Sequence, residues 1–330
     1  MPGKKIKKLK KIAVLTSGGD SPGMNPAIRA VVRTAIYHKI EVIGVKWGYD
    51  GLIKNITTPL ISRSVGGIIN RGGTILYSAR SKGFKTKAGR KKAFNTLKKH
   101  RVNGLIVIGG DGSYRGAHEL HQETDFPVIG VPGTIDNDIA GTDYTIGFYT
   151  AIDTAIEAID KIRDTAVSHN RLFLIEVMGR HAGFIALASA IAGGAEDALL
   201  PETPTNITKI IKQLQNYKKR GKVSSIIIVA EGDDAGNALE VAEKIRKKAG
   251  YETRVSVIGY QQRGGIPSAL DRILATRLGS AAVEELINGT KCAMVGIQTN
   301  EVITNPLEIA WEKKKPIDKS LLKLVEVMSC

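Results

Sequence analysis

Short runs of consecutive apolar residues recur along the 330-residue chain and are separated by longer stretches with helical spacing. Strands that are apolar throughout and alternate with helices are typical of a parallel sheet that is covered on both faces. We therefore predict an α/β fold with largely parallel strands. The strands are expected at 12–15, 41–45, 105–108, 127–131, 172–177, 225–230, 254–258 and 293–297, and helices at 24–38, 88–100, 113–121, 146–166 and 181–193.

The charge balance is basic, with 48 Lys and Arg against 32 Asp and Glu, which gives a formal net charge of +16. A lysine-rich run contributes part of this excess, and we interpret residues 1–10 as a basic N-terminal tail. Such a charge raises the alternative of a nucleic-acid-binding protein. Aromatic residues make up only 5% of the chain and no helix-turn-helix or stacking platform is evident, so this alternative is remote and we expect no nucleic-acid partner.

Composition excludes several other classes of protein. Hydrophobic residues make up 42%, enough for a large core, and a prior of ~150 residues per domain suggests two domains. The longest uncharged apolar stretch, 182–195, is shorter than the ~18 residues that a membrane span needs, so we expect no membrane partner. The only two cysteines, Cys292 and Cys330, cannot form a disulfide framework, which fits a cytoplasmic protein.

Three polar loops follow predicted strands, at 16–25 (TSGGDSPGMN), 109–113 (GGDGS) and 132–138 (PGTIDND). Glycines let a backbone approach an anion closely, and the helix that follows points its N–H groups at that anion. In the third loop, two carboxylates after a threonine suit proton abstraction from an alcohol beside a metal–phosphate cluster. Each loop alone is equally well a capped turn. Their convergence at one edge of a parallel sheet, where open α/β sheets bind ligands, favours a functional site.

Four arginines lie at predicted strand edges or in glycine-rich turns: Arg171, Arg180, Arg254 and Arg263. A guanidinium group matches phosphate oxygens in a bidentate geometry. Each of these arginines alone is more typical of a surface ion pair, and the neighbouring glycines favour phosphate binding somewhat more at Arg180 and Arg263. The sequence contains neither an ordinary P-loop nor a dinucleotide-binding glycine fingerprint.

Three further motifs accompany these loops along the chain: RGGT at 71–74, EVMGRHAG at 176–183 and QRGG at 262–265. With them, the chain from about residue 11 to near its C-terminus resembles the bacterial ATP-dependent 6-phosphofructokinase family. The resemblance implies transfer of the ATP γ-phosphoryl group to the 1-hydroxyl of fructose 6-phosphate, the committed step of glycolysis, with Mg²⁺ as cofactor. The products would be fructose 1,6-bisphosphate and ADP.

The same resemblance implies two Rossmann-like domains, each with three layers, α/β/α. The larger, ATP-binding domain would comprise 11–147 plus 262–311. The smaller, sugar-phosphate domain would comprise 148–261 plus 312–330. A homotetramer is the family's usual assembly.

Roles for individual residues also follow from the resemblance. Asp136 would accept the hydroxyl proton, Asp111 would hold Mg²⁺ through water, and Arg80 with Arg180 would stabilise the transferring group. Arg171 and Arg254 would bind the sugar phosphate of a neighbouring subunit. The ATP-binding set is Gly19, Arg80, Ser81, Gly110, Asp111, Gly112 and Ser113. The substrate-binding set is Thr134, Ile135, Asp136, Asp138, Arg171, Met178, Gly179, Arg180, Glu231, Arg254, Tyr260 and Arg263.

An effector site is implied as well, with ADP and phosphoenolpyruvate as its ligands and allosteric control as its consequence. Its residues are Arg29, Arg33, Arg163, Gly194, Ala195, Glu196, Arg220 and Lys222.

Two positions bear on the donor and one on the sugar phosphate. Pyrophosphate-dependent relatives, the nearer alternative, usually carry Asp in place of Gly112 and Lys in place of Gly133. Two glycines leave room for the α-phosphate of a nucleotide, so we expect the ATP form. Tyr260 stands where the bacterial family commonly has a histidine, and it cannot supply that side chain's positive charge.

Overall fold

The structure, a computed structural model, describes residues 9–169, 171–222 and 224–329. Most of the basic tail predicted at 1–10 therefore lies outside the described residues. Contacts divide the described chain into two compact units. The first comprises 9–134, Ile139–Gly147 and Arg263–Lys315, and the second comprises Ile135–Asp138, Phe148–Gln262 and the C-terminal segment from Pro316.

The first unit is built on a seven-stranded sheet in the order β11-β10-β5-β4-β1-β2-β3. Its central strands are parallel, and the two edge strands, β3 and β11, pair antiparallel with their neighbours. The strands are β1 (Lys11–Ser17), β2 (Glu41–Val45), β3 (Thr57–Leu60), β4 (Gly104–Gly109), β5 (Val128–Pro132), β10 (Cys292–Gln298) and β11 (Glu301–Pro306).

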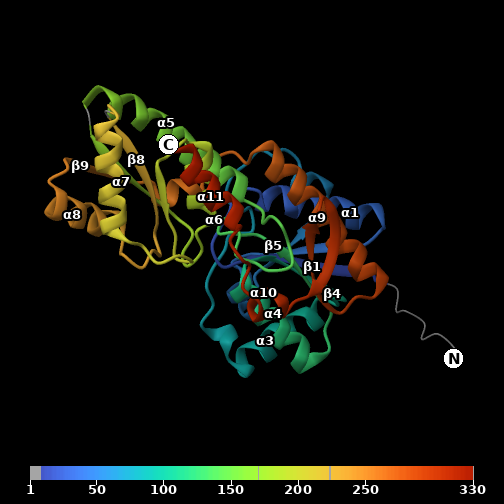
Figure 1. Ribbon diagram of the computed structural model, residues 1–330. Helices are drawn as coiled ribbons and strands as arrows, with labels where there is room; N and C mark the ends of the chain where they lie inside the picture. The colour runs from blue at the N-terminus through green and yellow to red at the C-terminus, as the bar shows by residue number, and fades with distance from the viewer. Residues whose placement is uncertain (1–8, 170, 223, 330) are drawn as a thin grey trace. The chain divides into compact units, whose positions relative to one another are not determined.

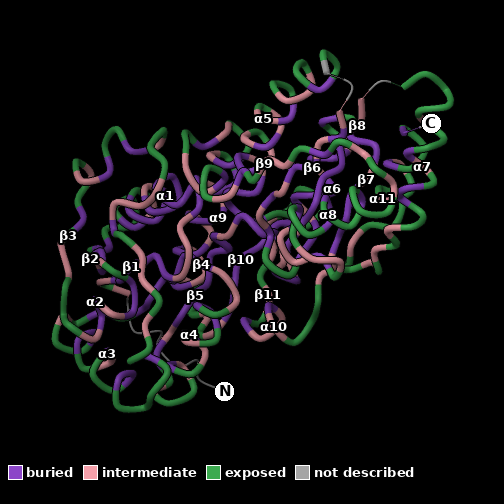
Figure 2. The backbone as a smooth tube through the Cα atoms, turned by 90° about the vertical axis from the view of Figure 1, so that its left-hand side faces the viewer, coloured by how far each residue is buried: buried purple, intermediate pink, exposed green. Residues whose placement is uncertain are grey.

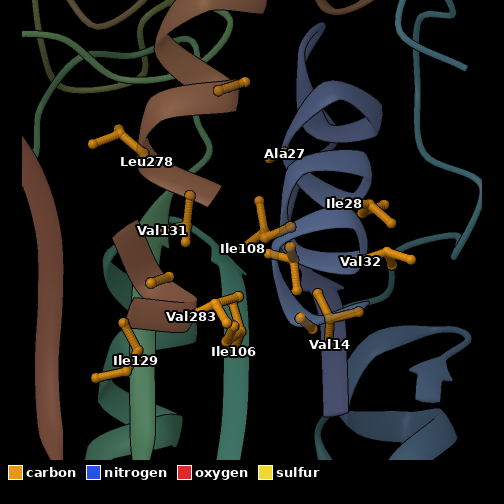
Figure 3. Packing of buried hydrophobic residues seen from close by; sticks show 14 of the residues in the cluster. Val14, Ala27, Ile28, Val32, Ile106, Ile108, Ile129, Val131, Leu278 and Val283 are labelled. Atoms are coloured by element: carbon orange, nitrogen blue, oxygen red, sulfur yellow. The ribbon is translucent and has the colours of Figure 1, made fainter. Parts of the chain in front are cut away.

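Helices cover both faces of this sheet (Figure 1). Alternate residues of β1 point to opposite faces, so Val14 packs in one apolar cluster and Leu15 in the other. Figure 3 shows the first cluster, in which side chains of two helices pack on Val14, Ile106 and Ile129 of the sheet. That face carries α1 (Met24–Tyr37) and α9 (Ala269–Asn288), and the other carries α2 (Gly48–Lys54), α3 (Lys87–Lys99), α4 (Asp111–Thr124) and α10 (Ile309–Glu312).

The second unit has a four-stranded parallel sheet in the order β7-β8-β6-β9. The strands are β6 (Leu172–Val177), β7 (Asp197–Leu199), β8 (Ser225–Ala230) and β9 (Thr253–Val257). One face packs on α5 (Phe148–His169), α6 (Phe184–Ala192) and α11 (Lys319–Met328), and the other on α7 (Ile207–Lys219) and α8 (Ala238–Ala249). The central strands of both sheets are largely buried, whereas the edge strands β3, β9 and β11 are mostly intermediate or exposed (Figure 2).

The predicted α/β fold with three layers in each unit is confirmed. Strands at 41–45, 172–177 and 225–230 have the predicted bounds. The helix expected at 181–193 begins instead at Phe184, because the preceding residues form a turn with positive φ angles at Gly179 (146°) and Arg180 (55°). No helix in the described part of the chain combines the length and apolar character needed to cross a bilayer.

Candidate active site

Three loops of the first unit leave the same edge of its sheet. The register aligns the last residues of three parallel strands, because Ser17 of β1 pairs with Gly109 of β4 and Gly109 pairs with Pro132 of β5. The amide of Gly133 donates to the carbonyl of Gly109 at 3.1 Å, which joins the second and third loops. The predicted convergence of the polar loops is therefore confirmed for the part of the third loop that belongs to this unit.

The first two loops pack closely on each other. Ser113 Oγ donates to the buried carbonyl of Ser17 at 3.0 Å, and Tyr49 Oη donates to the carbonyl of Ser113 at 2.5 Å. Burial raises the pKa of Tyr49, so its hydroxyl stays protonated and keeps donating. A Cβ on Gly109 would lie 2.6 Å from both Ser113 Oγ and Ser17 O, so only glycine fits there.

The second loop leads directly into α4, so the N-terminus of this helix lies at the same edge of the sheet. Asp111 is the first residue of α4, after Gly110, whose position at the N-cap has no side-chain hydrogen bond. The free N–H groups and dipole of a helix N-terminus favour an anion. A Cβ on Gly112 would meet no heavy atom within 4 Å, so this turn faces open space.

The segment that carries Arg80 and Ser81 is tied to the first loop. Ser78 Oγ donates to the carbonyl of Gly18 at 2.7 Å, and Thr16 Oγ1 donates to the carbonyl of Tyr77 at 2.7 Å. Ser81 itself donates to the Asp50 carboxylate. Arg80 is exposed, on a stretch of backbone whose position these bonds fix.

Arg263 lies over the first glycine loop. Its Nη1 is 3.9 Å from Asp20 Oδ1, and a Cβ on Gly19 would lie 2.4 Å from its Nη2. Any side chain at position 19 would therefore displace this guanidinium group. The second and third loops also approach each other, since a Cβ on Gly110 would lie 3.8 Å from Thr134 Cβ. The first unit thus brings Gly19, Ser113 and Arg263 to the same edge of the sheet as Gly110 and Thr134.

The third loop is divided between the units, since Ile135–Asp138 belong to the second. Asp136 is 8% exposed and Ile135 is 3% exposed, whereas Asp138 is half-buried. Asn137 between the two carboxylates has a positive φ of 54°, a conformation that asparagine tolerates better than most residues. The loop therefore holds one nearly buried carboxylate at position 136.

In the second unit, the residues that follow β6 and β8 lie together. Val177 pairs with Ala230 at the ends of these strands, so Met178 and Glu231, the next residues, lie side by side at the same edge of the sheet. Glu231 Oε1 accepts a hydrogen bond from the Arg180 amide at 2.7 Å. A Cβ on Gly232 would lie 1.9 Å from the carbonyl oxygen of Arg180, which shows how tightly the turn that presents Arg180 is packed.

The sequence alone predicted no role for Gln262, whose side chain hydrogen-bonds to the start of this turn. Its side chain is fully buried, accepts from the Met178 amide at 2.8 Å and donates to the Ala151 carbonyl at 3.1 Å. The signal available in the sequence was only its place beside Arg263 in a motif. A buried amide that satisfies two backbone groups is a positioning element, because losing it would leave both groups without a partner.

Arg171 and Arg254 meet at a residue that sequence reasoning also missed, Glu252. The carboxylate accepts from Arg171 Nε at 3.0 Å and from Arg254 Nη2 at 2.6 Å. Tyr260, in the 3₁₀ helix Gly259–Arg263, is 79% exposed.

The predicted effector residues are divided between the two units. In the second unit, Arg163 donates to the carbonyls of Gly193 and Gly194, the latter at 2.8 Å. Lys222 Nζ lies 2.7 Å from Glu196 Oε1, and the Glu196 side chain is 4% exposed. Ala195 is buried and Arg220 is exposed at the end of α7. Arg29 and Arg33 are one turn apart on α1 of the first unit.

Comparisons with known proteins show which family the chain resembles. The profile of the family described as "PFK: Phosphofructokinase" matches residues 11–286. The "ATP-dependent 6-phosphofructokinase" of Brevibacillus brevis is 54% identical over 321 residues, which cover 97% of this chain and 100% of the relative. The "ATP-dependent 6-phosphofructokinase 1" of Thermus thermophilus has the same identity and the same coverage.

A solved structure extends the similarity to the fold. Phosphofructokinase from Saccharomyces cerevisiae superposes with a TM-score of 0.84 at 37% identity, and the match covers 97% of this chain. The chain spans about half of that yeast chain, 47% of its length. Similarity along nearly the whole chain, together with glycine loops that meet at one sheet edge, places the chain in the phosphofructokinase family.

Proposed function

We propose that the chain is an ATP-dependent 6-phosphofructokinase. It transfers the γ-phosphoryl group of ATP to the 1-hydroxyl of fructose 6-phosphate in glycolysis, giving fructose 1,6-bisphosphate and ADP. The observation that carries this function is full-length similarity to relatives of that name. The converging loops of the first unit supply what a nucleotide needs, namely close backbone approach and a helix N-terminus.

Asp136 is the base in this proposal. Its carboxylate takes the proton of the 1-hydroxyl, the sugar oxygen bonds to the γ-phosphorus, and the bond to the bridging oxygen breaks to release ADP. The low exposure of Asp136 supports the role, because the residues around it shield the carboxylate from bulk water. Arg80 and Arg180 offset charge on the transferring group.

Mg²⁺ is the proposed cofactor, and the donor set fits it. Among the described residues, no cluster of three or more His, Cys, Asp or Glu could hold a metal with protein groups alone. Mg²⁺ usually keeps several waters and binds through one or two carboxylates plus substrate phosphates, which suits a single Asp111 beside the open turn at Gly112. When bound, the ion neutralises charge on the β- and γ-phosphates.

The remaining assignments are also proposals. The first unit would be the ATP-binding domain and the second the sugar-phosphate domain. Thr134, Asp138, Met178, Gly179 and Glu231 would hold the sugar. A cytoplasmic homotetramer, in which Arg171 and Arg254 reach a neighbour's substrate, remains the expected assembly.

A coupled assay with fructose 6-phosphate and Mg²⁺ tests the function directly, with either ATP or pyrophosphate as donor. We expect ADP to form with ATP, and no turnover with pyrophosphate. A purified, folded protein that forms no ADP from ATP would overturn the proposal, and turnover with pyrophosphate alone would select the alternative donor.

The open space at Gly112 gives a prediction about the donor. In Gly112→Asp the new Cβ meets no heavy atom within 4 Å, and the carboxylate stands in the first turn of α4, where it is expected to repel the phosphates of ATP. We expect kcat/KM for ATP to fall about 10- to 100-fold. Gly112→Asn adds the same bulk without charge and is the matched control. Equal losses in the two variants would show that bulk, not charge, limits this position.

The effector site gives a second prediction. Lys222 and Arg163 stand in one unit with the nearly buried Glu196, and this clustering of charges supports an anion or cation–nucleotide site. We expect ADP or phosphoenolpyruvate to change the initial rate at low fructose 6-phosphate, and Lys222→Gln to weaken that response several-fold. Rates unaffected by both compounds would contradict allosteric control.

A further inference from the structure

Glu252 bridges two arginines at one end of the second sheet. Arg171 directly precedes β6 and Glu252 directly precedes β9, and these parallel strands are neighbours with Leu172 paired to Thr253. The register therefore sets residues 171 and 252 side by side, and Arg254 follows two residues later on β9. One oxygen, Glu252 Oε1, accepts from Arg171 Nε at 3.0 Å and from Arg254 Nη2 at 2.6 Å.

All three side chains belong to the second unit and are partly accessible. The exposed fractions are 28% for Arg171, 55% for Glu252 and 47% for Arg254. The cluster therefore forms within one chain, whichever chain contributes the sugar phosphate. An incoming anion can reach it, because the side chains of Glu252 and Arg254 are each about half exposed.

The cluster carries enough positive charge to bind an anion with more negative charge than the Glu252 carboxylate. Two guanidinium groups face a single carboxylate, which leaves an excess of positive charge. Carboxylate and phosphate oxygens compete for the same guanidinium donors, and a phosphate monoester carries more charge and more acceptor oxygens. A phosphate and a carboxylate also repel each other when both lie beside the same donors.

We propose that Glu252 is an internal competitor for the 6-phosphate of the sugar substrate. It occupies the donors of Arg171 and Arg254 while no sugar phosphate is bound, and it gives them up on binding. This inference rests on the proposed function, which assigns both arginines to that phosphate. Glu252 thereby sets the affinity for fructose 6-phosphate below the value that the two arginines alone would give.

A purely structural role predicts a different outcome. β9 is an edge strand of the sheet, and ion pairs between its first residues and β6 could serve only to hold that edge. In that case, loss of the carboxylate would lower the midpoint of thermal unfolding and leave substrate affinity unchanged.

The test compares steady-state kinetics of the wild-type protein and E252Q, which keeps the shape of the side chain and removes its charge. Exposed ion pairs are weak, so we expect KM for fructose 6-phosphate to fall roughly three- to tenfold. kcat and KM for ATP should stay within about twofold, since neither depends on the competition. E252D, with a carboxylate set back by one methylene, should show an intermediate KM.

E243Q is the matched control, because Glu243 is a half-exposed carboxylate on α8 that pairs with Lys247 and lies in the same unit. It should leave every constant unchanged. A KM for fructose 6-phosphate that is unchanged or raised in E252Q overturns the proposal.

Failure of the inference can be told from failure of the proposed function. Wild-type turnover of fructose 6-phosphate and ATP tests the function by itself. If there is no turnover, calorimetric titration with inorganic phosphate still tests the subsite. Tighter phosphate binding by E252Q than by the wild type supports the competitor role, and equal or weaker binding rejects it.

Discussion

Replacing Asp136 with Asn is expected to lower kcat by about 10²- to 10⁴-fold, the range typical for removal of a general base. Asn has nearly the same shape, so the loop and its low exposure should be kept. An amide cannot accept the hydroxyl proton, however, so the loss should fall on kcat, while KM for ATP changes little. Initial rates at saturating ATP and fructose 6-phosphate give the measurement.

Asp125→Asn is the control for that experiment. Asp125 is exposed, pairs with Lys291 at 2.5 Å and has a φ of 51°, which asparagine also adopts. Its replacement should leave kcat at the wild-type value. If Asp136→Asn retained near wild-type kcat while folding normally, Asp136 could not be the base and the role would pass to another group.

The second large effect is expected at Arg180. Its main chain is fixed by the bond from its amide to Glu231 and by the tight approach of Gly232, so Arg180→Gln should leave the turn in place. In the proposed mechanism, the guanidinium charge is lost at the point where charge develops on the phosphoryl group. Removing one such preorganised donor typically costs about 10²- to 10³-fold in kcat.

Arg101→Gln provides the matched comparison, because Arg101 is exposed and has a similar left-handed φ of 58°. Any backbone strain of glutamine in that conformation is then common to both variants. A drop in kcat shared by both would indicate strain, whereas a drop confined to Arg180→Gln supports a role in transfer. A rise in KM for fructose 6-phosphate with unchanged kcat would instead place Arg180 among groups that only bind the sugar.

The sequence predicted the sheets well because their strands are apolar throughout. The runs at 172–177 and 225–230 have the same bounds in the structure, since both are buried central strands. The helix expected from residue 181 starts later, because Arg180 has a positive φ in a turn that packs closely on Gly232 of another strand's loop, and local periodicity carries no such information. The weakly apolar edge strand β3 was not predicted for a related reason, as it depends on pairing with β2.

The candidate site was predictable only where motifs contain it. Glycine loops and arginines stand out in the sequence by type and spacing, and the structure confirms that three loops share an edge. Gln262 and Glu252 act through partners distant in sequence, Ala151 in one case and Arg171 in the other. Neither partnership leaves a trace in local composition, so both required the strand register and the packing.

The path of the chain between the two units limits how the protein can be dissected. The chain changes unit after Thr134, Asp138, Gly147, Gln262 and Lys315. A recombinant fragment starting at Phe148 and ending at Gln262 would therefore lack both the four residues around Asp136 and the helix α11, whose Val325 packs into the apolar cluster of that unit. No single cut of the chain therefore yields either unit intact, so each unit can be studied only as part of the whole chain or as rejoined segments.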